Sequence, residues 1–110
     1  MQIIFGKENI EELKQRYTVL ELEEILLPEH NGQPSRMINT YCVIPAEKIP
    51  LDELPQLENW VTLHHDFLEG YHNEQYDYCL QCIDHLIGKF GGEVDSFYEE
   101  ILRRINNITK

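Results

Sequence analysis

Basic residues are scarce in this sequence of 110 residues, in which nine Lys and Arg stand against 20 Asp and Glu and give a formal net charge of −11. The acidic excess is nearly the same in both halves, because residues 1–55 carry 10 acids and 5 bases and residues 56–110 carry 10 and 4. Such a charge repels phosphate backbones and anionic bilayers. We therefore expect no direct binding to nucleic acid and no electrostatic attachment to a membrane.

Long apolar runs and cysteine pairs are lacking as well. No stretch approaches the roughly 18 consecutive apolar residues of a membrane span, and the mostly apolar residues 1–5 meet charged residues too soon for a signal peptide. The three cysteines, Cys42, Cys79 and Cys82, cannot all pair within one chain and are too few for a secreted disulfide scaffold. We expect a soluble protein of the cytoplasm, or of the host cytoplasm if the protein is viral.

Enzymatic motifs are also missing. The sequence contains no phosphate-binding glycine loop, no dinucleotide fingerprint and no nucleophile elbow. Paired acids such as Glu99 and Glu100 are sequence neighbours, which point in different directions on a helix. The sequence therefore predicts a protein that is not an enzyme, with no catalytic residue and no cofactor.

The residues that are present suffice for a packed core, since 42% are hydrophobic and 10% are aromatic. The length fits a single domain over residues 1–110. We expect an α+β fold in which residues 1–48 form a layer of one helix and a β-hairpin. A Pro-rich connector over 49–56 then leads to a helical layer over 57–108.

The N-terminal layer begins with a short helix that Asn9 can cap. The period then changes to alternation over 18–27, and a second strand, rich in β-branched and aromatic residues, runs over 36–44. An Asn-Gly pair between the strands tolerates the positive φ angles of a hairpin turn. We expect an antiparallel sheet of two strands, or of three if residues 1–5 add a strand.

The alternation in the first of these two strands assigns side chains to faces of the sheet. Leu20, Leu22 and Leu26 fall on one face, and Ile25 falls on the opposite face. Glu24 interrupts the apolar face.

The helical layer is predicted from three apolar stripes with helical spacing. A short polar break at 72–75 separates the first two stripes, which favours an antiparallel helical hairpin, and a glycine-rich break at 88–92 precedes the third. The stripes are formed by Trp60, Leu63, Phe67 and Tyr71, by Tyr76, Cys79, Leu80, Ile83 and Ile87, and by Phe97, Ile101, Leu102 and Ile105.

Residues 57–87 carry a second pattern within these stripes. It consists of Trp60, Leu63 and Phe67 on the first helix and Cys79, Ile83 and Leu86 on the second. This pattern resembles the tetratricopeptide repeat, a helical hairpin that packs against further hairpins of its kind. His64 stands where the repeat has glycine, and the turn is about three residues longer than in the repeat. The resemblance implies tetratricopeptide-like packing, with the last helix stacked where a next repeat would begin.

The segment Gly-Lys-Phe-Gly-Gly-Glu-Val-Asp-Ser-Phe-Tyr-Glu-Glu at 88–100 is similar to the ends of small uncharacterised proteins of tailed phages. This similarity implies a phage origin and no activity.

Cysteine and histidine gather in the helical layer, which raises the question of a metal site. The candidates are Cys79, Cys82 and His85 on the second helix and His64, His65 and His72 before it. Zinc takes thiolate and imidazole ligands, but on a helical wheel His85 begins to leave the face that the two cysteines share. A redox pair is disfavoured because Asp77 and Asp84 raise the pKa of thiols in the middle of a helix. We interpret the cysteines as small hydrophobic core residues and predict no metal site.

The charge pattern supplies the candidate site. Residues 49–88 contain eight acids and no Lys or Arg. With the apolar stripes turned inward, acidic side chains should line the outer faces of the helical hairpin, and aromatic anchors should stand among them. The predicted partner-binding residues are Glu58, Asp66, Glu69, Asp77, Tyr78, Asp84 and Tyr98. The alternatives are a surface that serves solubility alone and a surface whose carboxylates imitate the phosphates of nucleic acid.

These observations lead to three functional hypotheses. The first is a small, non-enzymatic protein–protein interaction module that binds a basic protein partner, in the form of a phage-encoded host modulator or assembly factor. The second is a structural subunit of a virion or another symmetric assembly, in which the protein forms homo-oligomers. The third is a small domain stabilised by zinc.

Overall fold

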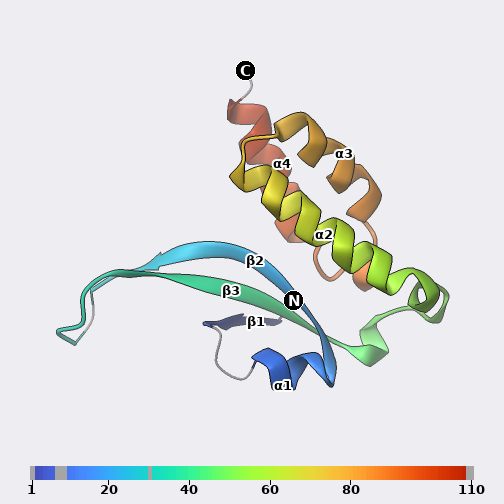
Figure 1. Ribbon diagram of the computed structural model, residues 1–110, viewed down its shortest axis with the longest axis horizontal. Helices are drawn as coiled ribbons and strands as arrows, with labels where there is room; N and C mark the ends of the chain where they lie inside the picture. Colours follow the sequence, from blue (N-terminus) through green and yellow to red (C-terminus); the bar gives the residue numbers. More distant parts are fainter. Residues whose placement is uncertain (1, 7–9, 30, 109–110) are drawn as a thin grey trace. The chain divides into compact units, whose positions relative to one another are not determined.

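The computed structural model describes residues 2–6, 10–29 and 31–108, so the expected helix cap Asn9 lies outside the described residues. The chain forms two compact units, Met1–Ala46 and Glu47–Lys110. The first unit holds an antiparallel sheet with one short helix, and the second holds three longer helices (Figure 1). The expected α+β class is confirmed.

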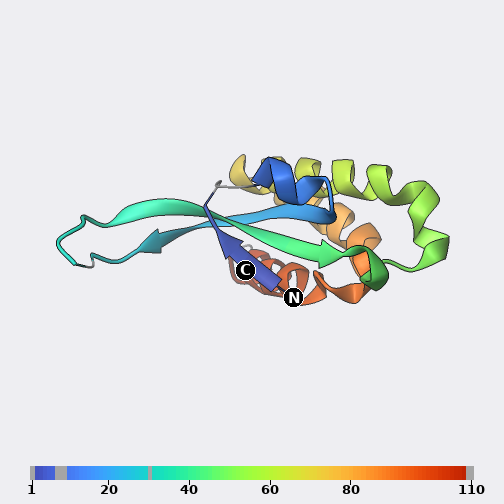
Figure 2. The ribbon, with the colours of Figure 1, turned by 90° about the horizontal axis from the view of Figure 1, so that it is seen from below.

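The first unit is a three-stranded antiparallel sheet with strand order β1-β3-β2. The strands are β1 (Gln2–Phe5), β2 (Tyr17–Leu27) and β3 (Arg36–Pro45), and the helix α1 (Ile10–Lys14) lies between β1 and β2 in the sequence. Of the two alternatives, a sheet of two strands or of three, the structure has the sheet of three. The hairpin of β2 and β3 reaches well past the short β1 in both ribbon views (Figures 1 and 2).

The turn of this hairpin has the expected chemistry. Asn31 and Gly32 both have positive φ, at 51° and 80°. Asn tolerates this region of backbone conformation better than most residues, and Gly enters it without steric cost. The Asn-Gly pair thus forms the turn for which its composition is suited.

Helix α1 covers one face of the sheet. Its buried Ile10 joins Val19, Tyr41 and Val43 in a hydrophobic cluster, against which Leu13 and Ile4 pack. Val19 lies directly opposite Val43 in the register of the two strands. Alternation places these side chains on one face, which explains why a helix of only five residues is held there.

A β-bulge in β2 corrects the predicted faces of its second half. Glu21 pairs with Tyr41 and Glu24 with Asn39, so β2 contains one residue more than β3 between these pairs. An extra residue reverses the alternation beyond it. Leu26 therefore leaves the face of Leu20 and is 62% exposed, whereas Ile25 takes its place on that face. The face assignments of Leu26 and Ile25 from simple alternation were wrong for this reason.

The second unit contains three α-helices, which are α2 (Leu57–His72), α3 (Tyr76–Leu86) and α4 (Asp95–Ile108). Short 3₁₀ turns flank them: η1 (Ala46–Lys48) and η2 (Leu51–Gln56) before α2, and η3 (Phe90–Gly92) before α4. The three-helix layer expected from the apolar stripes is thus present. Whether it follows tetratricopeptide packing stays a prediction.

The proline-rich segment between the layers is folded onto the helical unit. Ile49 is buried, and the backbone N–H of Phe90 donates a hydrogen bond of 2.9 Å to Oε2 of Glu53. A Cβ atom at Gly91 would lie 2.0 Å from the carbonyl oxygen of Lys48. This contact requires glycine, because any side chain would collide with the backbone of the 3₁₀ turn.

Candidate protein-binding surface

Helices α2 and α3 approach each other at Gly70. A Cβ atom at this position would lie 2.9 Å from Cδ2 of Tyr78 and 3.5 Å from Sγ of Cys79. Because glycine has no side chain, the ring of Tyr78 lies directly over the backbone of α2, while 40% of Tyr78 stays exposed. Gly70 was not predicted, although a glycine in the interior of a helix is a recognisable sign of close packing.

Five of the predicted site residues form an exposed acidic surface on these helices, which we name the acidic hairpin surface. It comprises Glu58, Asp66 and Glu69 on α2 and Asp77 and Asp84 on α3, and all five side chains are exposed. At helical spacing, the three acids of α2 fall within an arc of about 80° and the two acids of α3 within about 20°. Each helix therefore presents its acids on one side, as the periodicity predicts.

Tyr78 stands beside this surface and is held by its neighbours. A hydrogen bond with the thiol of Cys82 raises the pKa of the Tyr78 hydroxyl, and burial and the nearby charge of Asp66 raise the pKa further. The hydroxyl stays protonated at neutral pH and donates its one hydrogen to the sulfur of Cys82, which leaves its oxygen able to accept a further bond. The structure brings Asp66 and Tyr78 together from two different helices.

Tyr98, the second predicted aromatic anchor, cannot contact a partner. Tyr98 is fully buried, and its hydroxyl lies 2.7 Å from Nδ1 of His64. The prediction for Tyr98 is wrong because Tyr98 lies on the same side of α4 as Ile101 and Ile105, both of which are buried as well. That spacing of three and seven residues was the available signal for burial.

His64 lies at the centre of an aromatic cluster. Its ring centroid is 5.7 to 6.4 Å from the ring centroids of Phe67, Phe90, Phe97 and Tyr98. His64 is fully buried, so the position at which the tetratricopeptide repeat has glycine here holds a polar ring that bonds across to α4. The close approach to α3 is instead made six residues later, at Gly70.

Both cysteines of the helical unit are free and buried. Burial, with the charge of Cys82 as a smaller cause, raises the pKa of the Cys79 thiol to about 11, and burial also raises the pKa of the Cys82 thiol. Thiols with raised pKa values are poor nucleophiles and poor metal ligands at neutral pH. Within the described part of the chain, no three His, Cys, Asp or Glu side chains converge in a way that could hold a metal ion.

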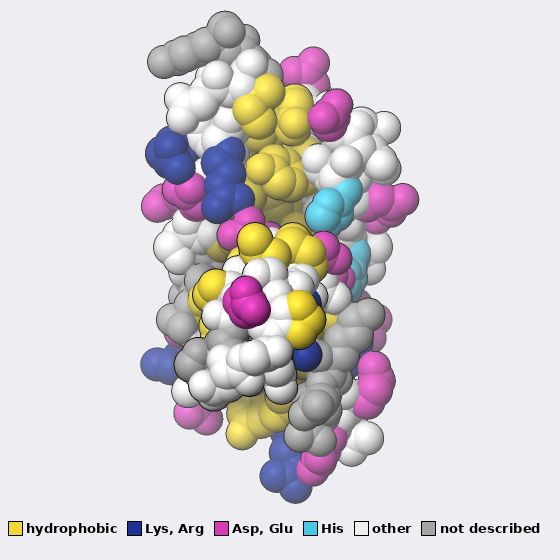
Figure 3. Space-filling model, turned by 90° about the vertical axis from the view of Figure 1, so that its left-hand side faces the viewer, with side chains coloured by type: hydrophobic (Ala, Val, Ile, Leu, Met, Phe, Trp, Pro, Cys, Tyr) yellow, Lys and Arg dark blue, Asp and Glu magenta, His cyan; other side chains and the backbone are white. Residues whose placement is uncertain are grey.

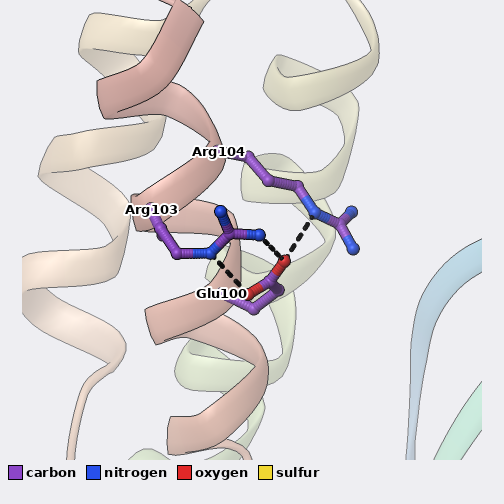
Figure 4. Close-up of polar contacts among 3 residues, drawn as sticks. All are labelled: Glu100, Arg103 and Arg104. Atoms are coloured by element: carbon purple, nitrogen blue, oxygen red, sulfur yellow. Dashed lines mark hydrogen bonds and ion pairs between the residues drawn. The ribbon is translucent and has the colours of Figure 1, made fainter.

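The acids of the acidic hairpin surface have no basic partner among the residues that the structure describes. On α4, by contrast, Glu100 forms ion pairs with Arg103 and Arg104 (Figure 4). Lys89, the first base after the acidic stretch, lies with Nζ 4.9 Å from the ring centroid of Trp60. The face drawn in Figure 3 carries acidic and basic side chains on either side of a central strip of hydrophobic ones.

Comparison of the chain with models of known protein families, with curated proteins and with solved structures found no match. The resemblances to tetratricopeptide repeats and to tailed-phage proteins therefore stay predictions. Within the described residues, every helix is too short or too polar to serve as a membrane span.

Proposed function

We propose that this protein is a non-enzymatic interaction module whose acidic hairpin surface binds a basic region of another protein. The observation that carries the proposal is the set of five exposed carboxylates on two adjacent helices that no described Lys or Arg neutralises. Unneutralised charge of one sign on a rigid face speeds encounter with a partner of the opposite sign and selects against partners of the same sign.

Tyr78 gives this surface an anchor of the kind that dominates binding energy. Tyr is enriched among the residues that contribute most at interfaces, because its ring buries a large area and its hydroxyl can form a hydrogen bond. The ring is fixed over Gly70 before any partner arrives, so little side-chain entropy is lost on binding. In this proposal the partner inserts an apolar group beside Tyr78 and places Lys or Arg near Asp66.

The biological role that we propose is that of a phage-encoded host modulator or assembly factor, which acts in the host cytoplasm. This part of the proposal rests on the resemblance of residues 88–100 to the ends of tailed-phage proteins, which stays a prediction.

Affinity capture with charge-reversed variants tests the proposal. The immobilised protein is exposed to extract of its native cells at low salt, and bound proteins are eluted with rising salt. We expect a basic protein whose binding weakens with salt and whose affinity falls about tenfold or more in the variant Glu69→Lys, Asp77→Lys, Asp84→Lys.

The matched control reverses three exposed acids elsewhere, in Glu12→Lys, Glu29→Lys, Glu47→Lys. Both variants change the net charge by the same amount, so only a local role of the acidic hairpin surface separates them. Equal weakening in the two variants, or no captured protein with salt-sensitive binding, would leave the acids with a role in solubility alone and would refute the proposal.

A further inference from the structure

We propose that two copies of this chain pair through strand β1, which lies at one edge of the sheet in the first unit. Among the described residues, strand β1 is bonded on one side only, to β3, with Gln2 opposite Val43 and Phe5 opposite Thr40. This inference goes beyond the proposed function, because it concerns a different surface and a different partner.

The backbone groups that β1 offers can be identified from its pairing. In an antiparallel pair, residues alternate between those that bond to the neighbouring strand and those whose N–H and C=O point away from it. The N–H of Gly6 donates to the carbonyl oxygen of Asn39 at 2.8 Å, which continues the register of β1 and β3. Gln2 and Ile4 therefore bond to β3, and Ile3 and Phe5 direct their N–H and C=O groups outward.

These outward groups match those of a second β1 strand. When two copies run antiparallel with Ile4 opposite Ile4, Ile3 of each copy faces Phe5 of the other. Each of these two pairs then exchanges both hydrogen bonds. All four outward groups of each strand, two N–H and two C=O, are thereby hydrogen-bonded. The result is a continuous six-stranded sheet with order β2-β3-β1-β1-β3-β2.

The side chains support the same register. Ile3 and Phe5 share one face of β1 and are 44% and 60% exposed. In the paired strands each Phe5 lies directly across from the other copy's Ile3, and cross-strand pairs of an aromatic with a β-branched residue are favourable. The exposed apolar side chains of β1 thus cover one another.

The charge distribution selects a second copy as the occupant. Strand β1 contains no charged residue, no proline and no bulge, so its short length is the one feature of a protected edge strand that it has. The opposite edge, β2, carries Glu21, Glu23 and Glu24 together with the bulge. A second copy, which also has a net charge of −11, can approach the uncharged edge with the least repulsion, whereas a basic partner finds no carboxylate there.

Sedimentation equilibrium of the full chain, with any tag at the C-terminus, tests the proposal. We expect the mass to rise from 13.1 kDa toward twice that value as the concentration increases from about 10 μM to about 1 mM, because a short edge buries a small area. Higher salt should favour the dimer by screening the repulsion between the two acidic copies. Binding of a basic partner responds to salt in the opposite direction, so the two proposals can fail separately.

Two variants with the same change in charge test whether the dimer depends on the β1 edge or on exposed apolar side chains in general. Ile3→Lys, Phe5→Lys should abolish the dimer. Leu26→Lys, Met37→Lys, which replaces another exposed apolar pair, at 62% and 57%, should leave it intact. Ile3→Pro removes an outward N–H but no bond to β3, and it should weaken the dimer at least tenfold while far-UV circular dichroism stays unchanged.

Amide hydrogen exchange supplies a readout for each residue. At high concentration the amides of Ile3 and Phe5 should gain protection, and that of Gly6, which already bonds to Asn39, should not. A strict monomer at all concentrations and salts, or a dimer that survives Ile3→Lys, Phe5→Lys, overturns the proposal.

Discussion

Gly70 is the residue on which the geometry of the acidic hairpin surface depends. Gly70 lies in the last turn of α2, and a glycine inside a helix costs up to about 1 kcal/mol relative to alanine, so its presence needs a compensating contact. That contact is the ring of Tyr78, whose Cδ2 lies 2.9 Å from the position of a Cβ atom at Gly70. The close packing of α2 and α3 at Gly70 offsets the cost of this glycine in helix stability.

A double-mutant cycle tests this account of Gly70. In the wild-type background Gly70→Ala should be neutral or destabilising, because the new methyl group displaces Tyr78. In the Tyr78→Ala background the same change should stabilise the protein by about 0.5 to 1 kcal/mol, as alanine does in an unobstructed helix. Urea denaturation of the four proteins gives the coupling free energy, and a Gly70→Ala effect that is the same in both backgrounds would contradict the account.

Glu100 offers a residue-scale prediction about pH. Hydrogen bonds from Arg103 and, to a smaller extent, from Arg104 lower the pKa of Glu100 from 4.5 to about 2. A lowered pKa in the folded state stabilises the protein at pH values above 4.5, and this stabilisation is lost as the pH falls from 4.5 toward 2. An NMR titration of the carboxyl carbon should therefore have a midpoint near pH 2. The midpoint should rise further in Arg103→Ala than in Arg104→Ala, and equal midpoints in the three proteins would be evidence against these hydrogen bonds.

Sequence patterns can predict the exposure of single residues but not their distant partners. The exposed positions of Asp66, Asp77 and Asp84 follow from helical periodicity alone. The partner of His64 does not, because Tyr98 is 34 residues away in the sequence, and only the packing of α2 against α4 brings the two side chains together.

Among the elements, strand β2 depends most on a single irregularity. Its bulge is closed by the side chain of Thr40, whose hydroxyl donates to the carbonyl oxygen of Glu23 at 2.7 Å and accepts from the N–H of Glu23 at 3.3 Å. The threonine thereby replaces backbone bonds that the bulge removes from the ladder. Alternation could predict that β2 exists, but it could not predict the bulge, because the bulge depends on a side chain of the neighbouring strand.

Replacement of this threonine should destabilise the first unit. Thr40→Val keeps the shape of the side chain but leaves the part-buried backbone groups of Glu23 without this partner, at a cost of about 1 to 3 kcal/mol. Thr18→Val on β2, where no side-chain hydrogen bond is found among the described residues, should change stability by less than about 0.5 kcal/mol. Thermal denaturation compares the two, and similar losses of stability would show that the hydroxyl of Thr40 has no special role.

The second prediction at the scale of elements concerns the glycine-rich break before α4, against which the segment around Lys48 packs. Gly88 and Gly91 both have positive φ, at 85° and 64°, but only Gly91 has backbone within 4 Å of a would-be Cβ atom. Gly88→Ala should therefore cost about 1 kcal/mol from backbone strain, and Gly91→Ala should cost at least 2 kcal/mol more, because Lys48 must move as well. Urea denaturation gives the free energy of unfolding of both variants. Equal losses would mean that the segment around Lys48 does not pack at Gly91.

At the scale of the whole molecule, charge is distributed so that different surfaces suit different partners. The uncharged β1 edge and the acidic hairpin surface belong to different compact units. The sequence could predict the sign of the net charge and the acidic stretch over 49–88. It could not predict the free edge, because which strand lies at the edge follows from the order β1-β3-β2 and not from the order of the strands in the sequence.

The most direct test of the central claim is site-specific photocrosslinking in the native cells. Tyr78 and Tyr17 are exposed to nearly the same degree, at 40% and 38%, and each is replaced in turn by p-benzoylphenylalanine. We predict that position 78 forms a covalent adduct with a basic protein and that Glu69→Lys, Asp77→Lys, Asp84→Lys abolishes the adduct. Position 17 should form no adduct with that protein. Adducts of equal yield at both positions, or none at position 78, would contradict the claim that the acidic hairpin surface is a protein-binding site.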